Sequence, residues 1–287
     1  MELIGAGDFQ DMDTSTHPHA HSIFGGHSVA DFDENIREQC SAHFEGALTS
    51  RDASTLFNTT RLWALLGNHP SYAAVDVITD GLPRSFRELL EDGSINQTSD
   101  IRQLVEDGAS ARIRDLQDID DAIGAFVTEV AQLLEAKCQV NCYLTPPQRR
   151  GFNPHFDTAD VIIVQCEGMK HWQLYSSYRD QQTLPLRDTP WEPDRYLPIG
   201  EPRTICLAPG DTLYLPRGTM HEAFCTTDTS LHLTVSVDPQ TVFDVLVERL
   251  KELAFADKLL RQRSAGVTCP LNAASLMEAA LVNLTRK

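Results

Sequence analysis

The stretch from about Gln139 to Asp238 consists of short runs of alternating apolar and polar residues, and it limits the possible folds more than any other feature. Each run is rich in β-branched or aromatic residues and ends at Gly, Pro or Asp, which is typical of strands joined by tight turns. Many short strands at close spacing predict an antiparallel barrel or jelly roll. The runs are QVNCYLTP, DVIIVQCEG, HWQLYSS, RTICLAPGD, DTLYLPRG, EAFCTT and SLHLTVSVDP.

The segments on either side of this region have helical spacing. Upstream, the apolar residues of QDIDDAIGAFVTEVAQLLEAK form one stripe, which predicts an amphipathic helix. Similar spacing predicts a helix from Asp31 to Leu48, AAVDVITDG predicts a strand, and SFRELLEDG predicts a short helix capped by Ser85. After Pro239, two helical stretches are separated by Pro270. We therefore expect an α+β fold in which helices flank a barrel.

These patterns divide the chain into three parts. Residues 1–28 are polar, include four histidines and lack a hydrophobic period, so we expect a flexible arm. Residues 29–238 form the predicted globular domain, with its barrel core at about 139–238. Residues 239–287 form a predicted C-terminal helical region. Because these helices are amphipathic but too few to build a core, we expect them to pack on the barrel or to pair in a homodimer.

Charge and cysteine content narrow the classes of partner and compartment. The formal net charge of −17 disfavours nucleic acids and anionic membranes, because neutralising phosphates requires Lys and Arg, and it favours a basic or neutral partner. Seven cysteines without a CxxC pair argue against a disulfide framework and a zinc ribbon. The acidic start lacks the features of a signal peptide, and no apolar run is long enough to span a membrane. We expect a cytoplasmic protein.

The segment PHFDT has the strongest chemical signal. Alternation along a strand sends residues i and i+2 to the same face, so we expect His155 and Asp157 to point together. A third candidate ligand, His221, follows the turn PRG in GDTLYLPRGTMHEAF. Two histidines and one carboxylate that leave coordination positions open form the facial triad of non-heme Fe(II) oxygenases. The sequence thus predicts a metal site formed by His155, Asp157 and His221.

Two blocks of the barrel resemble one known family. NCYLTPPQRRGFNPHFDTADVIIVQCEGMKHWQLY resembles the N-x-Y-x-TP, PH-x-D and QxEGxKxW block of JmjC-type, cupin-fold 2-oxoglutarate oxygenases of the ribosomal-oxygenase branch. GDTLYLPRGTMHEA with SLHLTVS resembles the second block of that branch. The resemblance covers about Gln139 to Asp238 and reaches the flanking helices only loosely. It implies a double-stranded β-helix of the JmjC type.

The resemblance also implies roles for single residues. His155, Asp157 and His221 match the iron ligands. Lys170 matches the basic residue that pairs with the distal carboxylate of 2-oxoglutarate. A cation at the far end of the pocket also fits the charge of a dianionic cosubstrate.

Three further residues match positions around the cosubstrate. Asn141 and Tyr143, two residues apart on one predicted strand, match polar residues that line its pocket, and His232 matches a histidine on the last strand. Satisfied structural roles explain these three residue types almost as well. By the residues alone, Trp172 is expected in the core. Arg149 and Arg150 are expected in a solvated loop.

The function implied by the resemblance is that of an Fe(II)- and 2-oxoglutarate-dependent oxygenase, which uses O₂ to hydroxylate a side chain of a protein or peptide. N-demethylation begins with the same step and stays open. A second hypothesis is a cupin that binds a metal or small ligand without catalysis, which predicts no succinate release. A metal-dependent isomerase or dioxygenase of the small-cupin kind ordinarily has three His and one Glu as ligands, unlike the H-x-D pattern.

The chain departs from the branch at both ends. Members usually continue after the barrel with a helical dimerisation region and a winged-helix domain, whereas residues 239–287 leave room for the helices alone. The N-terminal third also lacks a clear W-x-K-x-P start. A ribosomal protein and another polypeptide, such as the precursor peptide of a biosynthetic pathway, therefore both stay open as the substrate.

Overall fold

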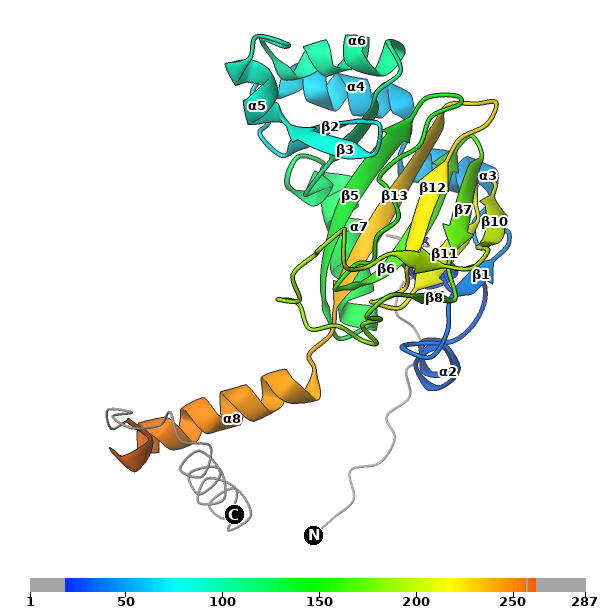
Figure 1. The fold of residues 1–287 in the computed structure, drawn as a ribbon. Coiled ribbons are helices and arrows are strands. Elements are labelled where there is room, and N and C mark those ends of the chain that lie inside the picture. The colour runs from blue at the N-terminus through cyan, green and yellow to red at the C-terminus, as the bar shows by residue number, and fades with distance from the viewer. Residues whose placement is uncertain (1–18, 257, 262–287) are drawn as a thin grey trace. The chain divides into compact units, whose positions relative to one another are not determined.

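The computed structural model describes residues 19–256 and 258–261, and a large antiparallel sheet forms its centre (Figure 1). The strand order is β1-β11-β6-β13-β5-β4-β2-β3. The eight strands are β1 Ala42–Phe44, β2 Val75–Thr79, β3 Leu82–Ser85, β4 Ser110–Ile113, β5 Lys137–Thr145, β6 Asp160–Glu167, β11 Thr212–Leu215 and β13 Ser230–Asp238.

A smaller sheet packs against one face of the large sheet. It has the order β10-β7-β12, with β7 Lys170–Leu174, β10 Arg203–Leu207 and β12 His221–Phe224, and a pair β8 Ser177–Tyr178 and β9 Pro198–Ile199 follows it. Apolar side chains from both sheets form a single buried cluster, which includes Val161, Ile163 and Leu213 from the large sheet and Trp172, Leu174 and Leu207 from the small one. The prediction of a jelly-roll barrel with flanking helices is confirmed.

Strand β7 is the central strand of the small sheet, and its register positions two candidate site residues. Lys170, Trp172 and Leu174 are buried, whereas the residues between them are half-buried, as expected for a strand with one face in a barrel. Lys170 pairs with Leu207 of β10, and Leu174 pairs with His221 of β12. Lys170 is therefore the first residue of β7, and His221 lies beside the last residue of the same strand.

Helices cover the other face of the large sheet. Their buried residues join the sheet's outer face in one core, in which Phe126 and Val130 lie with Val140 and Leu233. Figure 1 shows α4, α5 and α6 gathered with β2 and β3 at one end of the sheet. The helices are α1 His19–Ser22, α2 Val29–Asn35, α3 Ser50–Leu56, α4 Thr59–Asn68, α5 Phe86–Glu91, α6 Ile101–Glu106 and α7 Asp121–Leu133, with 3₁₀ turns η1 Thr98–Asp100 and η2 Leu116–Asp118.

Several local predictions are confirmed with their capping residues. Helix α7 begins after Asp120, whose side chain accepts a hydrogen bond from the Ile123 N–H at 3.0 Å. Helix α5 begins after Ser85, which forms a capping box with Glu88. The strand predicted at AAVDVITDG is β2.

The helix predicted from Asp31 to Leu48 is wrong beyond Asn35. Helix α2 ends there, and Glu38 adopts a left-handed backbone conformation with φ of +59°. The chain then forms β1 and pairs with β11, with Ala42 opposite Tyr214. The helical spacing misled because Phe32 and Phe44 are both buried, although they belong to different elements.

The flexible arm predicted for residues 1–28 is wrong for residues 19–28. Ala20, Ile23 and Phe24 are at most 1% exposed, and the Phe24 ring packs on Phe32 at 4.8 Å between centroids. The sequence around these three residues is mostly polar and has no hydrophobic period, so it did not predict that they belong to the core. Residues 1–18 lie outside the described residues.

Contacts divide the chain into two units, with the boundary after Pro239. The second unit contains α8 Val242–Ala256 and the 3₁₀ turn η3 Lys258–Arg261, so the first helical stretch predicted after Pro239 is confirmed. The second predicted stretch, after Pro270, lies outside the described residues. Among the helices that the structure describes, none is long and apolar enough to cross a membrane.

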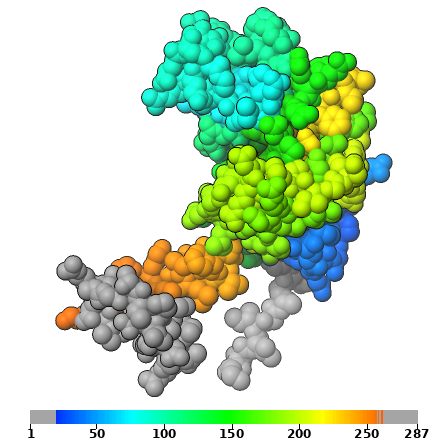
Figure 2. All heavy atoms as spheres, in the orientation of Figure 1, coloured from blue at the N-terminus to red at the C-terminus, as the bar shows by residue number. Residues whose placement is uncertain are grey.

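A long segment, residues 179–197, connects β8 to β9. Figure 2 shows the yellow-green part of the chain, to which it belongs, over the middle of the face turned to the viewer. Aromatic packing anchors this segment, since Phe156, Tyr178 and Tyr196 share a buried cluster with Met220. The Tyr178 hydroxyl also lies within hydrogen-bond distance of the carbonyl oxygens of Gln182 and Gly218, at 3.0 and 3.1 Å.

Candidate active site

Two histidines from distant parts of the chain meet in a small backbone bridge. The N–H of His155 donates to the carbonyl of His221 at 3.0 Å, and the N–H of His221 donates back at 2.7 Å. Their rings lie 4.5 Å apart between centroids. The bridge brings both imidazoles to one point on the inner side of the barrel.

Both imidazoles are oriented by the same kind of hydrogen bond. The Nδ1 of His155 donates to the carbonyl of Asn153 at 2.8 Å, and the Nδ1 of His221 donates to the carbonyl of Thr219 at 2.9 Å. This arrangement fixes the tautomer and leaves each Nε2 with a free lone pair. Nε2 is therefore the atom that each ring can offer to a metal ion.

Asp157 completes the group. One Asp157 carboxylate oxygen, Oδ2, lies 3.6 Å from the Nε2 of His221. Each of the three residues His155, Asp157 and His221 offers one ligand atom. These three atoms lie within 4.8 Å of one another, which is close enough for a single ion.

Strand alternation does not cause this convergence, so that premise of the prediction is wrong. His155 lies in an isolated bridge, Asp157 lies in the loop after it, and β6 begins only at Asp160.

The turn before His221 is shaped by a glycine. Gly218 has a φ of +85°, and a Cβ added there would lie 2.3 Å from the carbonyl oxygen of Gln182. The Gly218 N–H donates to the carbonyl of Asp157 at 2.9 Å. A side chain at this position would strain the backbone and push against segment 179–197.

Burial keeps one of the histidines neutral. Burial, with a smaller contribution from the neighbouring His155, lowers the pKa of His221 to about 4, although Asp157 opposes the shift. His221 is therefore unprotonated at neutral pH, as a metal ligand must be.

Lys170 is 1% exposed and lines the same cleft as His155, Asp157 and His221. Its Nζ donates to the Thr145 hydroxyl at 2.5 Å, and among the described residues no carboxylate lies within ion-pair distance of it. Burial lowers its pKa from 10.5 to about 8. A buried ammonium without a carboxylate partner is costly unless an anion binds beside it.

One cleft connects the metal-binding group with Lys170. Most of its wall is apolar or aromatic. Such a cleft with a few convergent polar groups is the usual form of a small-molecule site. The lining residues include Tyr143, Phe152, His155, Asp157, Val161, Ile163, Lys170, Trp172, His221, Ala223, His232 and Thr234.

Two polar atoms in the cleft wall lack a partner among the described residues. They are the Nε1 of Trp172 and the Nδ1 of His232, both buried. Burial and the nearby Lys170 move the pKa of His232 well below its ordinary value, so its ring is neutral. Buried polar atoms are normally hydrogen-bonded, and these two are free to bind a polar ligand.

The other two predicted pocket residues have different surroundings. Tyr143 lines the cleft and stacks on His232, with ring centroids 4.9 Å apart and planes nearly parallel. Asn141 is not among the lining residues. Its carboxamide oxygen accepts a hydrogen bond from the backbone N–H of Asp115 at 3.2 Å, which holds a left-handed residue at the start of η2.

Three aromatic residues near the site did not follow from the sequence as functional. Trp172 was expected in the core, and it is buried there, but it also lines the cleft two residues after Lys170. The rings of Phe152 and Trp191 contact the His155 ring edge to face, at 5.6 and 6.4 Å between centroids. Period two along β7 could have identified Trp172, whereas no pattern marks Trp191.

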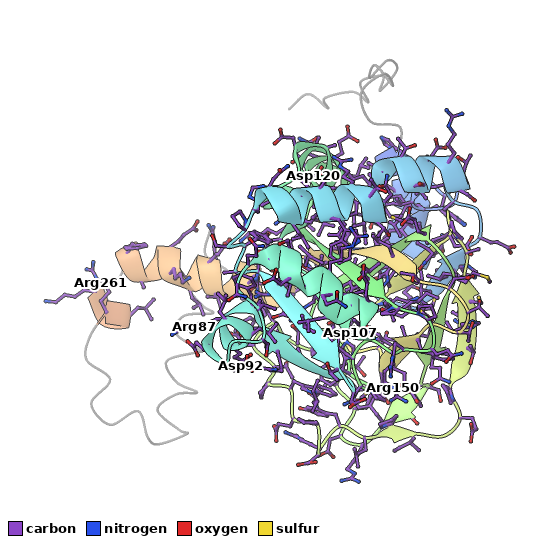
Figure 3. The ribbon with its side chains drawn as sticks, turned by 90° about the horizontal axis from the view of Figure 1, so that it is seen from above. Arg87, Asp92, Asp107, Asp120, Arg150 and Arg261 are labelled. Atoms are coloured by element: carbon purple, nitrogen blue, oxygen red, sulfur yellow. The ribbon has the colours of Figure 1, made fainter. Side chains whose placement is uncertain are left out.

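The arginines before the metal-binding segment do not line this cleft. Arg150, labelled in Figure 3, is exposed and lies 3.6 Å from Glu222. Arg149 lies in a second, polar cleft with Asp107. Both positions agree with the expected solvated loop.

Comparison with known proteins supports a JmjC-type fold. A model of the JmjC domain matches residues 116–245. Ribosomal oxygenase 1 of Danio rerio is 31% identical over 184 residues, which cover 63% of this chain and 33% of that protein. A protein of Dictyostelium discoideum, named bifunctional lysine-specific demethylase and histidyl-hydroxylase NO66, is 37% identical over 133 residues, which cover 46% of this chain and 26% of that protein. The chain thus spans a third or less of the length of these relatives.

Solved structures show the same fold at lower identity. The X-ray structure of Escherichia coli ycfD has a TM-score of 0.57 and 16% identity, over 90% of this chain and 68% of that one. A structure of the same protein, described as a ribosomal oxygenase in complex with cobalt and 2-oxoglutarate, has a TM-score of 0.54 and 16% identity, over 90% of this chain and 66% of that one.

Proposed function

We propose that this chain, which is similar to ribosomal oxygenases with a JmjC domain, is an Fe(II)- and 2-oxoglutarate-dependent oxygenase acting on a side chain of a protein or peptide. One observation carries the proposal. A group of two histidines and one carboxylate and a buried, unpaired lysine line the same cleft. A divalent cation and a dianion are the two ligands that these groups would neutralise.

His155, Asp157 and His221 would hold the iron. Two imidazoles and one carboxylate suit Fe(II) and leave coordination positions for cosubstrate and O₂. Their donor atoms fit, since each histidine presents a free Nε2 and Asp157 supplies the negative charge. When bound, iron, 2-oxoglutarate and O₂ together supply the oxidising chemistry, with succinate and CO₂ as products.

Lys170 would pair with the distal carboxylate of 2-oxoglutarate, with Thr145 fixing its ammonium. The unpaired Nε1 of Trp172 and the ring of His232 would bind polar atoms of the cosubstrate. Tyr143 would close the wall by stacking on His232. Asn141 does not line the cleft, so its role would be to hold the turn at Asp115 through its hydrogen bond to the Asp115 N–H.

The chain's own residues would also shield the reaction. The apolar and aromatic lining would exclude water from around a bound cosubstrate, which would strengthen the interaction of Lys170 with its carboxylate. Phe152 and Trp191 flank the ring of His155 and would restrict the approach of a substrate side chain.

The test is anaerobic binding of Fe(II) and 2-oxoglutarate, followed by measurement of succinate after O₂ is admitted with candidate basic peptides. Binding without succinate under any substrate would favour the alternative of a non-catalytic cupin. Formaldehyde among the products would identify N-demethylation, which the names of some relatives include.

We also propose that the substrate is a basic or neutral polypeptide and not a nucleic acid. The net charge of −17 repels polyphosphates and attracts cationic peptides. This attraction is screened over about 8 Å at physiological salt, so apparent affinity for a basic peptide should fall as salt rises. Turnover of a Lys/Arg-containing peptide, its acidic counterpart and single-stranded DNA should be compared across a salt series. Preference for the acidic peptide, or oxidation of DNA, would contradict the proposal.

We further propose that the chain forms a homodimer through the unit after Pro239. On α8, Val242, Phe243, Leu246 and Leu250 are large apolar residues that remain exposed. Light scattering at tens of micromolar should give the mass of a dimer, and the double change Leu246→Asp with Leu250→Asp should give a monomer. Glu248→Ser, on the same helix, is the matched control and should leave the dimer intact. A wild-type monomer would reject the idea.

A further inference from the structure

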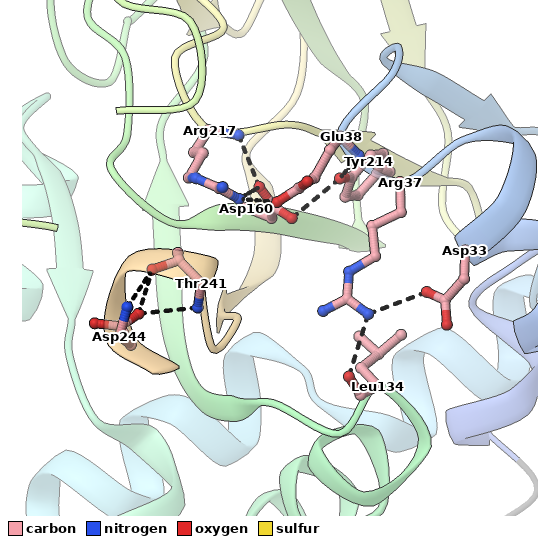
Figure 4. A network of polar contacts seen from close by, with 9 residues as sticks. All are labelled: Asp33, Arg37, Glu38, Leu134, Asp160, Tyr214, Arg217, Thr241 and Asp244. Atoms are coloured by element: carbon pink, nitrogen blue, oxygen red, sulfur yellow. Dashed lines mark hydrogen bonds and ion pairs between the residues drawn. The ribbon is translucent and has the colours of Figure 1, made fainter. Parts of the chain in front are cut away.

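A buried network of polar side chains lies behind the turn that precedes His221 (Figure 4). Asp160, the first residue of β6, is 1% exposed. Its carboxylate accepts hydrogen bonds from the Arg217 backbone N–H at 2.9 Å and from the Tyr214 hydroxyl at 3.1 Å. The Arg217 guanidinium lies 3.4 Å from the same carboxylate and 2.5 Å from Glu38. The Glu38 N–H donates to the Tyr214 hydroxyl at 2.9 Å, which closes the network.

The network joins the two segments that hold the metal-binding side chains. Asp160 follows Asp157 closely in the chain, and Arg217 lies in the turn that leads to His221. The Gly218 N–H makes a second link, since it donates to the carbonyl of Asp157 at 2.9 Å. The segments 157–160 and 216–221 are therefore tied at two separate points.

A third segment reaches the network through Glu38. Its backbone has a φ of +59°, a left-handed conformation that is unfavourable for a residue with a Cβ. Its side chain is 40% exposed, although the guanidinium that it binds is 8% exposed. Residues held against their backbone preference cluster at functional sites.

The network is an inefficient way to stabilise a core. Burial of an ion pair costs several kcal/mol per ion before the partners attract one another, and apolar residues of similar volume often serve stability as well. The Nε of Arg217 also lacks a partner among the described residues, which adds to the cost. The place of the pair, beside both metal-binding segments, indicates a role in fixing geometry.

We propose that Asp160 and Arg217 are positioning residues for the metal centre, and that Glu38 extends this role to the segment before the barrel. Together they hold the turn so that His221 meets Asp157 at the ion. The inference rests on the metal site proposed above. Loss of residues that orient metal ligands typically weakens metal binding by about 10- to 100-fold.

The test is calorimetric titration of the full chain with Mn(II). Asp160→Asn should weaken Mn(II) binding by about tenfold or more, and Glu38→Gln should weaken it less. The matched control is Asp120→Asn, at the residue labelled in Figure 3, because Asp120 is also a buried carboxylate paired with an arginine, Arg61, but lies at the start of α7. It should leave Mn(II) binding unchanged. The absorption spectrum of bound Co(II) should change in Asp160→Asn and not in Asp120→Asn, since destabilisation does not alter ligand geometry.

Other outcomes separate the inference from its premise. Mn(II) binding within about twofold of wild type in both Asp160→Asn and Glu38→Gln would overturn the positioning role, and so would an equal loss in Asp120→Asn. If Asp160→Asn does not fold, Glu38→Gln alone decides, because its carboxylate is partly exposed. Failure of the wild type to bind Mn(II) more tightly than Asp157→Ala would reject the metal site itself.

Discussion

Replacing Asp157 or His221 by alanine will abolish 2-oxoglutarate-dependent succinate formation and greatly weaken metal binding, while the protein stays folded. Each change removes one of the donors that surround a single point, and two donors hold a divalent ion poorly. The Asp157 side chain is 41% exposed in a loop, so its loss removes few packing contacts. The measurements are succinate yield, Mn(II) titration and thermal unfolding.

The matched control is His171→Ala. His171 is a half-buried histidine on β7 that stacks on Phe224 and does not line the cleft. This variant should retain turnover and Mn(II) binding. Succinate formation at the wild-type rate in either triad variant would show that the ion, if any, binds elsewhere.

Lys170→Ala will raise the concentration of 2-oxoglutarate required for half-maximal binding by roughly 10- to 100-fold, with Mn(II) binding nearly unchanged. A lost hydrogen bond to a charged group costs about 1.5–3 kcal/mol, which corresponds to that range. The measurement is titration of the Mn(II)-loaded protein with 2-oxoglutarate. Lys137→Ala, at an exposed lysine that starts β5, is the control.

The same lysine sets an expected pH dependence. Its pKa in the free protein is about 8, so it is charged below that pH and neutral above it. Wild-type affinity for 2-oxoglutarate should therefore weaken as pH rises through 8 and beyond, and the Lys170→Ala variant should lack this change. An affinity in the variant equal to that of the wild type would place the anchor for the distal carboxylate on another residue.

The sequence predicted those parts of the fold in which buried residues recur at a regular spacing along one strand or helix. Period two identified the barrel strands, because one face of each is buried between two sheets. The stripe of α7 identified that helix for the same reason. The role expected of Lys170 came from the family resemblance, and the structure places this residue at the start of β7.

The rest depends on contacts between distant segments. The convergence of Asp157 with the histidines comes from a loop and from a bridge to His221, neither of which has a period. Phe24 and its neighbours are buried because other elements cover them, although the local sequence is polar. Trp191 lies in a long irregular segment, and nothing before the structure placed it near His155.

The register of β7 has a consequence for the length of molecule that the cleft can bind. Lys170 and the residue opposite His221 are the two ends of this strand, and a strand rises about 3.3 Å per residue. The hydrogen-bonded ladder therefore acts as a ruler between cation and metal, and its length is set by the backbone. A slip of one residue would turn Lys170 out of the barrel, and a slip of two would change the span by about 7 Å. Under the proposed function, the length of dicarboxylic acid that fits would depend on this strand pairing as well as on the side chain of Lys170.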